Sequence, residues 1–220
     1  MRKLWVGLVS SLSMLLLVTL ASQTQAAPII FSDQASFLTA AGPLTVEDFE
    51  AETATPETVT PQASIAFDFF TASSSPNALK LLNESFFGNH NTTPGGSIFL
   101  SADTDMSLVD ATVTLIFSTP IIEFGLFMID IDLGDGSVSI NGIGYSIAAT
   151  GNLGSQYFGI IEDTPFTSVI LNGGFENSHW SMDDLAFSVI PEPSTFLLTS
   201  LGLIGFALTN RRRRSSKQSF

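Results

Sequence analysis

Short apolar segments separated by turn residues fill most of the chain between Ala63 and Val189, and this pattern limits the possible folds more than any other feature. Leu108 to Ser118 is a strand candidate rich in β-branched residues, which Pro120 ends before a second long strand over Ile121 to Ile131. Asn141-Gly142 predicts a hairpin turn. Such turn signals recur about every 8 to 12 residues, a spacing typical of β-sandwiches.

We therefore expect an all-β fold, an antiparallel β-sandwich with a jelly-roll-like arrangement of about ten strands. The 19 phenylalanines, most at alternating positions, would fill the space between two sheets. Ser32-Asp33 predicts the N-terminus of one short helix, which ends at Gly42-Pro43. The chain has no cysteine, so its stability has to come from the core or from a bound metal.

The N-terminus has the three parts of a secretory signal peptide. Met1-Arg2-Lys3 is basic, Leu4 to Leu20 is apolar, and a segment of small and polar residues ends at Ala26. This order predicts a signal peptide over residues 1–26, cut after Ala26. The exported domain is then residues 27–190.

The C-terminus carries a second processing pattern, residues 191–214. Pro191-Glu192-Pro193 predicts a stiff, extended linker. Residues 194–210 carry no charge and predict a hydrophobic helix near the lower length limit for a membrane span, about 17 residues. The arginine cluster that follows would stay in the cytoplasm, together with residues 215–220.

This tail resembles the PEP-CTERM sorting signal, the bacterial C-terminal signal that exosortases recognise. The resemblance rests on Pro191, Glu192, Pro193 and Ser194, with Ile190 as one extra residue after Val189. The apolar segment follows in the same order, and then the membrane stop of Arg211, Arg212, Arg213 and Arg214. The resemblance implies an exosortase-type partner, insertion into the inner membrane, cleavage near Pro-Glu-Pro, and a place at the cell surface or in the extracellular matrix. In that family the exported domain is often linked to exopolysaccharide.

Charge is very unevenly distributed along the chain. Residues 27–190 hold 20 of the 21 acidic residues and one base, Lys80, which gives a net charge of −19 with histidine neutral. A surface this acidic repels nucleic acid and anionic lipid, so we expect neither as a partner. The same acidity suits divalent cations, and it also suits simple solubility outside the cell.

One candidate calcium site is the run that contains Asp130, Asp132 and Asp135 beside Gly134 and Gly136. Alternate carboxylates at a strand end can converge on a hard cation that takes six to eight oxygen ligands. The run lacks the spacing of an EF-hand. The alternative is an acidic turn that uses Asp and Gly for backbone reasons.

A second candidate joins two distant stretches, Asp48-Phe49-Glu50 and Asp183-Asp184-Leu185-Ala186-Phe187. This pair resembles jelly-roll adhesion and carbohydrate-binding domains, in which two such stretches lie side by side and often hold a structural calcium ion. The resemblance implies Glu50 and Asp183 or Asp184 as ligands. The alternative is that one aspartate is solvated and the other caps a turn.

Support for catalysis is thin, and we expect a non-enzymatic protein. The chain has two histidines, no cysteine and no G-x-S-x-G or H-E-x-x-H motif. A structural or adhesive role at the surface is the main interpretation. A carbohydrate-binding module is the alternative, with Trp180, Tyr145 and Tyr157 as aromatic candidates. A secreted glycoside hydrolase is the second alternative, because that reaction needs only two carboxylates.

Overall fold

The structure is a computed structural model, and it describes residues 26–52, 61–83, 93, 96–102, 111–131, 134–151, 154–174 and 179–189. The predicted signal peptide before Ala26, the sorting signal and hydrophobic helix after Val189, and Asp132 lie outside these residues. Within the described ranges, no helix has the length and apolar character that a membrane crossing requires.

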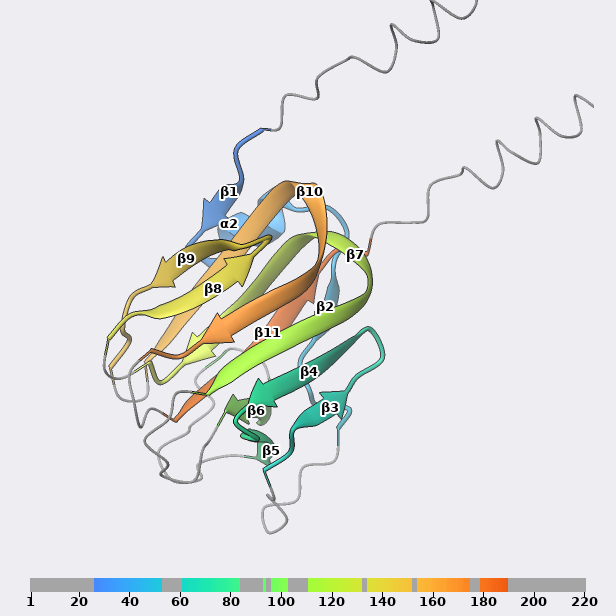
Figure 1. Cartoon of the computed structure of the whole chain (residues 1–220). Coiled ribbons are helices and arrows are strands. Elements are labelled where there is room, and N and C mark those ends of the chain that lie inside the picture. The colour runs from blue at the N-terminus through green and yellow to red at the C-terminus, as the bar shows by residue number, and fades with distance from the viewer. Residues whose placement is uncertain are drawn as a thin grey trace, which may run out of the picture.

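Eleven strands and one helix make up the described fold, and every strand pair is antiparallel (Figure 1). The helix is α2 (Gln34–Ala40). The strands are β1 (Ile29–Phe31), β2 (Thr45–Glu47), β3 (Ser64–Ala66), β4 (Phe70–Ser75), β5 (Leu79–Asn83), β6 (Ile98–Ala102), β7 (Thr112–Ile129), β8 (Gly136–Ile140), β9 (Ile143–Ile147), β10 (Ser155–Asn172) and β11 (Trp180–Phe187).

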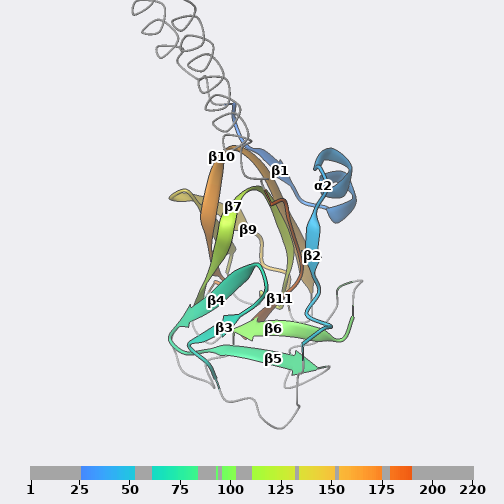
Figure 2. The same ribbon diagram turned by 90° about the vertical axis from the view of Figure 1, so that its right-hand side faces the viewer.

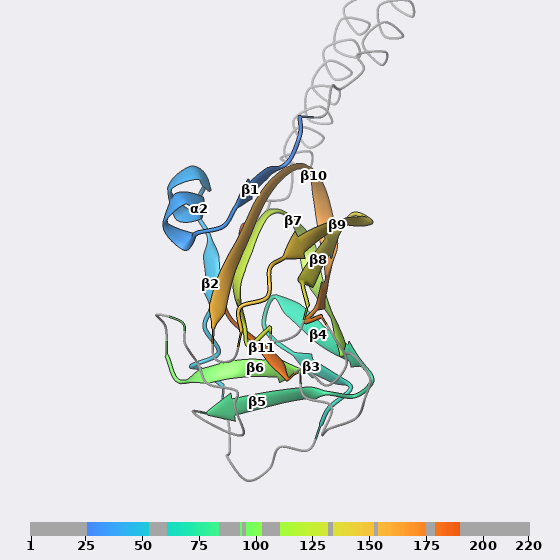
Figure 3. The ribbon, with the colours of Figure 1, turned by 90° about the vertical axis from the view of Figure 1, so that its left-hand side faces the viewer.

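All the strands belong to one sheet with the order β5-β6-β11-β7-β10-β8-β9, to which β1, β2, β3 and β4 add at the sides. The first half of β7 pairs with β4, whereas its second half pairs with β11. Figures 2 and 3 show β7 and β10 arching over, so that the sheet folds into two facing layers. The expected antiparallel all-β fold with one short N-terminal helix is confirmed, but a single bent sheet forms both layers.

The bend corrects one expectation from the sequence. We expected Pro120 to separate two strands, but β7 runs through it as one strand of 18 residues. Pro120 is exposed, and it lies where the β7–β10 register jumps from Ile116↔Ser168 to Ile121↔Phe166. A proline is tolerated there because its missing N–H removes no ladder hydrogen bond. Strand β10 is likewise a single strand of 18 residues.

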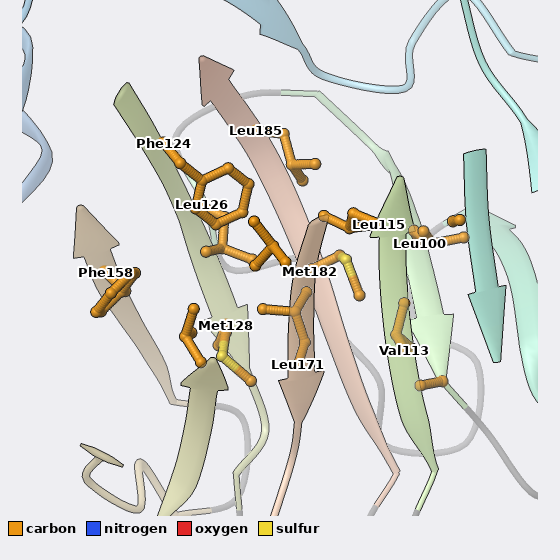
Figure 4. Packing of buried hydrophobic residues seen from close by; sticks show 14 of the residues in the cluster. Leu100, Val113, Leu115, Phe124, Leu126, Met128, Phe158, Leu171, Met182 and Leu185 are labelled. Atoms are coloured by element: carbon orange, nitrogen blue, oxygen red, sulfur yellow. The ribbon is translucent and has the colours of Figure 1, made fainter. Parts of the chain in front are cut away.

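The two layers enclose one hydrophobic core, built from the side chains that alternate along each strand (Figure 4). Phe117 from the first half of β7 contacts Phe187 of β11, with 5.1 Å between the ring centroids. Val113 and Leu115 face the same core from that half of β7. Phenylalanine therefore fills the space between the layers, as the composition predicts.

The helix α2 covers the outer side of the layer that contains Tyr157 of β10. Asp33 is its N-cap, and the Asp33 carboxylate accepts a hydrogen bond from the Ser36 N–H at 2.8 Å. Phe37 is fully buried and packs against Tyr157 of β10 with 5.9 Å between the ring centroids. A second, smaller cluster of apolar side chains forms beneath the helix.

Candidate functional site at the bulge of strand β11

The two stretches that the sequence singled out meet on β11. Leu185 pairs with Glu47 of β2, and Met182 pairs with Leu100 of β6. Strands β2 and β6 therefore follow one another along the same edge of β11, with Asp183 and Asp184 at the junction between them. The structure thus brings the C-terminal acidic pair beside the end of β2, as the resemblance implied.

A β-bulge occupies this junction. On the opposite edge, Asp183 pairs with Phe127 and Ala186 pairs with Gly125, so β11 has one residue more than β7 in this interval. Asp184 takes up the extra residue in the left-handed region, with φ of 50°. This conformation is uncommon for a residue other than glycine, although aspartate is among the residues that adopt it most readily.

Asp183 holds the bulge through its own carboxylate, which is fully buried. Its Oδ1 accepts a hydrogen bond from the Asp184 N–H at 2.8 Å, and its Oδ2 accepts one from the Thr93 hydroxyl at 2.7 Å. Asp184 is also buried, with 7% of its surface exposed. Thr93 was not anticipated, because nothing in its polar sequence context distinguishes it from its neighbours.

The end of β2 is organised by two further carboxylates. Glu47 Oε1 accepts a hydrogen bond from the Phe49 N–H at 3.0 Å, which supports Phe49 at a φ of 57° with its ring buried. Glu50 Oε1 accepts hydrogen bonds from the N–H groups of Ser97 and Ile98, the latter at 2.6 Å. The segment that leads into β6 therefore contacts both acidic stretches, through Thr93 and through Ser97.

Electrostatics at the junction follow from burial and from the density of acids. Burial raises the pKa of Glu47, the Phe49 hydrogen bond opposes that rise, and Glu52, Asp48 and Asp68 add to it. The pKa of Tyr157 is raised far above its usual range, first by burial and then by the negative charges of Asp184 and Asp33.

Tyr157 is also unusual in its hydrogen bonding. Its hydroxyl is buried and finds no hydrogen-bond partner among the described residues. The oxygen instead lies against Gly125, where a side chain would collide with it.

Each candidate ligand in this junction already has a protein partner. Glu50 and Asp183 accept the hydrogen bonds given above, and the described part of the chain contains no group of three or more histidine, aspartate or glutamate side chains placed to hold a metal ion.

The other acidic run begins at the far end of β7. Asp130 is buried with φ of 62°, and its N–H donates to the Gly154 carbonyl at 2.8 Å. Asp135 accepts a hydrogen bond from the Ser146 hydroxyl at 3.3 Å. Asp132 lies outside the described residues, so a calcium site at these three residues stays a prediction.

The aromatic candidates do not form an exposed platform for a sugar, which corrects the expectation for two of them. Trp180 is 1% exposed, and its Nε1 donates to the Ala111 carbonyl at 3.3 Å. Tyr157 is 4% exposed. Tyr145 alone is partly exposed, and its hydroxyl donates to Glu162 at 3.1 Å. Trp180 and Tyr157 are core residues. Each is buried between elements that are distant in the sequence.

Comparison with known proteins identifies the tail. The PEP-CTERM protein-sorting motif matches residues 189–214. The motif implies export, membrane anchoring at the C-terminus before processing, and recognition by exosortase-type machinery. No curated protein sequence matches the chain.

The fold is similar to several solved structures at low sequence identity. The K2 cleaved adhesin domain of Lys-gingipain is 13% identical, with a TM-score of 0.47, over 67% of this chain and 100% of that one. TmCBM61 in complex with β-1,4-galactotriose is 13% identical, with a TM-score of 0.32, over 56% and 90%. CtCBM11 is 10% identical, with a TM-score of 0.32, over 70% and 99%.

Proposed function

We propose that this chain is a non-enzymatic structural or adhesive component of a bacterial extracellular matrix, sorted to the cell surface through its C-terminal signal. One observation carries the proposal, the match of residues 189–214 to the PEP-CTERM sorting motif. That motif implies export, so the acidic domain would lie outside the cytoplasm, and removal of the motif would leave the domain free or attached at the surface.

Several carboxylates among the described residues stabilise the fold of the exported domain. Glu50 binds the start of β6, Asp183 binds the bulge of β11, Glu47 binds the turn after β2, and Asp33 caps α2. Glu123, which is 8% exposed, accepts a hydrogen bond from the Gly42 N–H at 3.0 Å. These acids fix the backbone, which is the task of residues that stabilise a fold.

The mass of the surface form tests the sorting step. Cleavage near Pro191-Glu192-Pro193 removes the hydrophobic segment and the arginines, so mass spectrometry of surface-extracted protein should find no peptide from 196–214. A variant with Glu192→Ala should remain at the full C-terminal length in the membrane fraction. The proposal fails if the surface form of the unmodified chain retains Phe196 to Arg214.

The adhesive role has its own test, because a sorted protein could also bind a glycan or cleave one. A strain that lacks the chain should form a less cohesive matrix, and the full-length gene should restore it. Binding of the exported protein to one neutral glycan on an array would favour the carbohydrate-binding alternative. Release of sugar from the strain's own exopolysaccharide would favour the hydrolase.

We also propose that a calcium ion stabilises the bulge of β11. Two adjacent aspartates, Asp183 and Asp184, are buried in a domain whose one base is Lys80. Buried carboxylates require hydrogen bonds, a cation or a proton, and a cation would relieve the repulsion between these two charges.

A further inference from the structure

Strand β9 is an edge of the sheet with the properties that proteins usually avoid at an edge. Within the described residues it pairs with β8 alone, and it ends the strand order β5-β6-β11-β7-β10-β8-β9 (Figures 1 and 3). It contains no proline, no charge and no bulge. Such an edge presents backbone donors and acceptors that suit pairing with another strand.

The hairpin turn determines which backbone groups face outward. Asn141 and Gly142 have φ of 52° and 78°, the two positive values of a type I′ turn, and Ile140 pairs directly with Ile143. Alternate residues of β9 therefore bond to β8, beginning with Ile143. The N–H and C=O groups of the residues between them, Gly144 and Ser146, point away from β8.

The side chains of β9 are symmetric about Tyr145. The strand reads Ile143-Gly144-Tyr145-Ser146-Ile147, with isoleucine at both ends and a small residue on each side of the tyrosine. In an antiparallel pair centred on Tyr145, Gly144 would lie opposite Ser146 of the other strand, and Ile143 opposite Ile147. The outward donors and acceptors then match, and Ile143, which is 53% exposed, gains an apolar neighbour.

Charge favours the same pairing. The exported domain carries a net charge of −19, so two copies repel each other over most of their surfaces. No acidic or basic residue occurs from Gly136 to Ile161, the interval that contains β8 and β9, and the exposed Asp135 beside this interval accepts a hydrogen bond from the Ser146 hydroxyl. Glu162, which accepts the hydrogen bond of the Tyr145 hydroxyl, is 4% exposed.

We propose that this protein forms a two-fold symmetric dimer in which β9 pairs antiparallel with β9 of a second copy, centred on Tyr145. An isologous contact of this kind requires a self-complementary surface, which the symmetry of the strand provides. The pairing joins two sheets into one continuous sheet. The other outer strands are less suitable, because β1, β2 and β3 have only three residues each and β5 carries Lys80.

Cysteine cross-linking of the full-length chain in the producing cells tests the dimer. The chain has no cysteine, so a single introduced thiol reports one position. Tyr145 would face its own copy at a Cα–Cα distance of about 4.5 Å, within the range of about 4.4–6.8 Å that a disulfide requires. Tyr145→Cys should give a disulfide-linked band at twice the monomer mass, whereas Ser139→Cys on the interior strand β8 should not.

Two further sets of variants keep the test decisive if Tyr145→Cys reduces folding. Chains with Gly144→Cys and chains with Ser146→Cys, produced together, should cross-link more than either alone. In the Tyr145→Cys background, Gly144→Pro removes an outward N–H without disturbing the β8 ladder and should lower the dimer yield about tenfold, because each dimer loses two hydrogen bonds. Gly144→Ala keeps that N–H, and an added Cβ meets nothing within 4 Å, so it should cross-link normally.

Two results would overturn the proposal. One is a monomer from both the Tyr145→Cys chain and the mixed chains while export and protease resistance stay normal. The other is a cross-linked product whose mass differs from twice that of the chain, which would assign the β9 edge to a different protein. The test does not depend on the proposed matrix role, because it reads only the pairing of the chain with itself.

Discussion

The carboxylate of Glu50 accepts a hydrogen bond from the backbone N–H of Ile98 at 2.6 Å, although 48 positions separate the two residues. This contact attaches the end of the β2 segment to the start of β6, and the same oxygen also binds the Ser97 N–H. Strand β6 in turn pairs with β11 beside the bulge. Glu50 therefore caps the backbone at the start of β6 from the segment that follows β2, and both strands pair with β11.

Replacement of Glu50 tests this cap. Glu50→Ala leaves two N–H groups without their acceptor and should lower the free energy of unfolding by about 1–2 kcal/mol, measured from the urea midpoint. Glu50→Gln retains an oxygen acceptor and should cost less. Equal midpoints for the alanine variant and the unmodified protein would show that water replaces the cap at no cost.

The close approach at Gly125 gives a second prediction. A Cβ on Gly125 would collide with the Tyr157 hydroxyl and would lie 3.0 Å from Phe37 Cε1. Gly125→Ala should therefore destabilise the fold by about 1–3 kcal/mol in denaturant titrations. Gly144→Ala is the matched control, because nothing lies within 4 Å of its Cβ. A Gly125→Ala variant as stable as the control would contradict the packing of Tyr157 over this glycine.

The buried hydroxyl of Tyr157 gives a third prediction. Since the oxygen has no hydrogen-bond partner among the described residues, Tyr157→Phe should stabilise the fold by about 1 kcal/mol at pH 8. Tyr145→Phe is the control and should destabilise it, because the Tyr145 hydroxyl donates to Glu162.

The pH dependence of stability above pH 8 gives a further test of the same hydroxyl. The pKa of Tyr157 is raised in the folded state, so the unfolded chain releases this proton near pH 10 while the folded chain retains it. The protonated Tyr157 phenol makes its full contribution to the free energy of unfolding below about pH 10, and this contribution falls as the pH rises further. The advantage of Tyr157→Phe should therefore increase from pH 8 to about pH 11, and an advantage that stays constant would contradict a buried, protonated phenol.

Glu47 also has a raised pKa, so its contribution to stability likewise falls as the pH rises, but in the acidic range. Burial is the main cause of its raised pKa, so the ionised carboxylate is less favourable in the folded state than in the unfolded chain. The protonated form favours folding below the ordinary value of 4.5, and that contribution is lost as the pH rises through the folded-state pKa.

Glu47→Gln imitates the protonated carboxyl. It should be more stable than the unmodified protein at neutral pH and should equal it at a pH below the ordinary pKa of glutamate. Chemical denaturation at both pH values measures the difference. A glutamine variant that is less stable at neutral pH would show that the Phe49 hydrogen bond outweighs burial at this carboxylate.

Thermal unfolding with calcium and with a chelator tests the proposed ion at the bulge. Calcium should raise the melting temperature of the unmodified protein, because a ligand that binds only the folded state stabilises it. Asp183→Asn with Asp184→Asn should abolish the shift, while Asp68→Asn should retain it. The proposal is wrong if calcium leaves the unmodified melting temperature unchanged.

Local chemistry made much of the fold predictable. The N-cap at Asp33 and the Asn141-Gly142 turn depend on residues close together in sequence, and both are present. The strands were found because apolar residues alternate along them. The adjacency of the Glu50 and Asp183 stretches came from a resemblance, and the register Leu185↔Glu47 agrees with it.

Long-range pairing made the rest unpredictable. Pro120 ends a strand by any local rule, yet β7 continues through it because the register with β10 jumps at that point. Trp180 was a surface candidate by residue type, but its ring is buried with its N–H on Ala111, 69 positions away. Thr93 gained its role only when the segment before β6 was placed beside Asp183, 90 positions away.

The amino-acid order alone determined most of the strand segments, the short helix and the PEP-CTERM motif, because periodicity, capping and proline geometry act over a few neighbouring residues. Only the tertiary structure decided which edge of each strand is paired, which aromatic rings are buried, and that β9 pairs with β8 alone among the described residues. Those outcomes depend on register between strands that lie tens of positions apart, and a shift of one residue would turn every side chain to the opposite face.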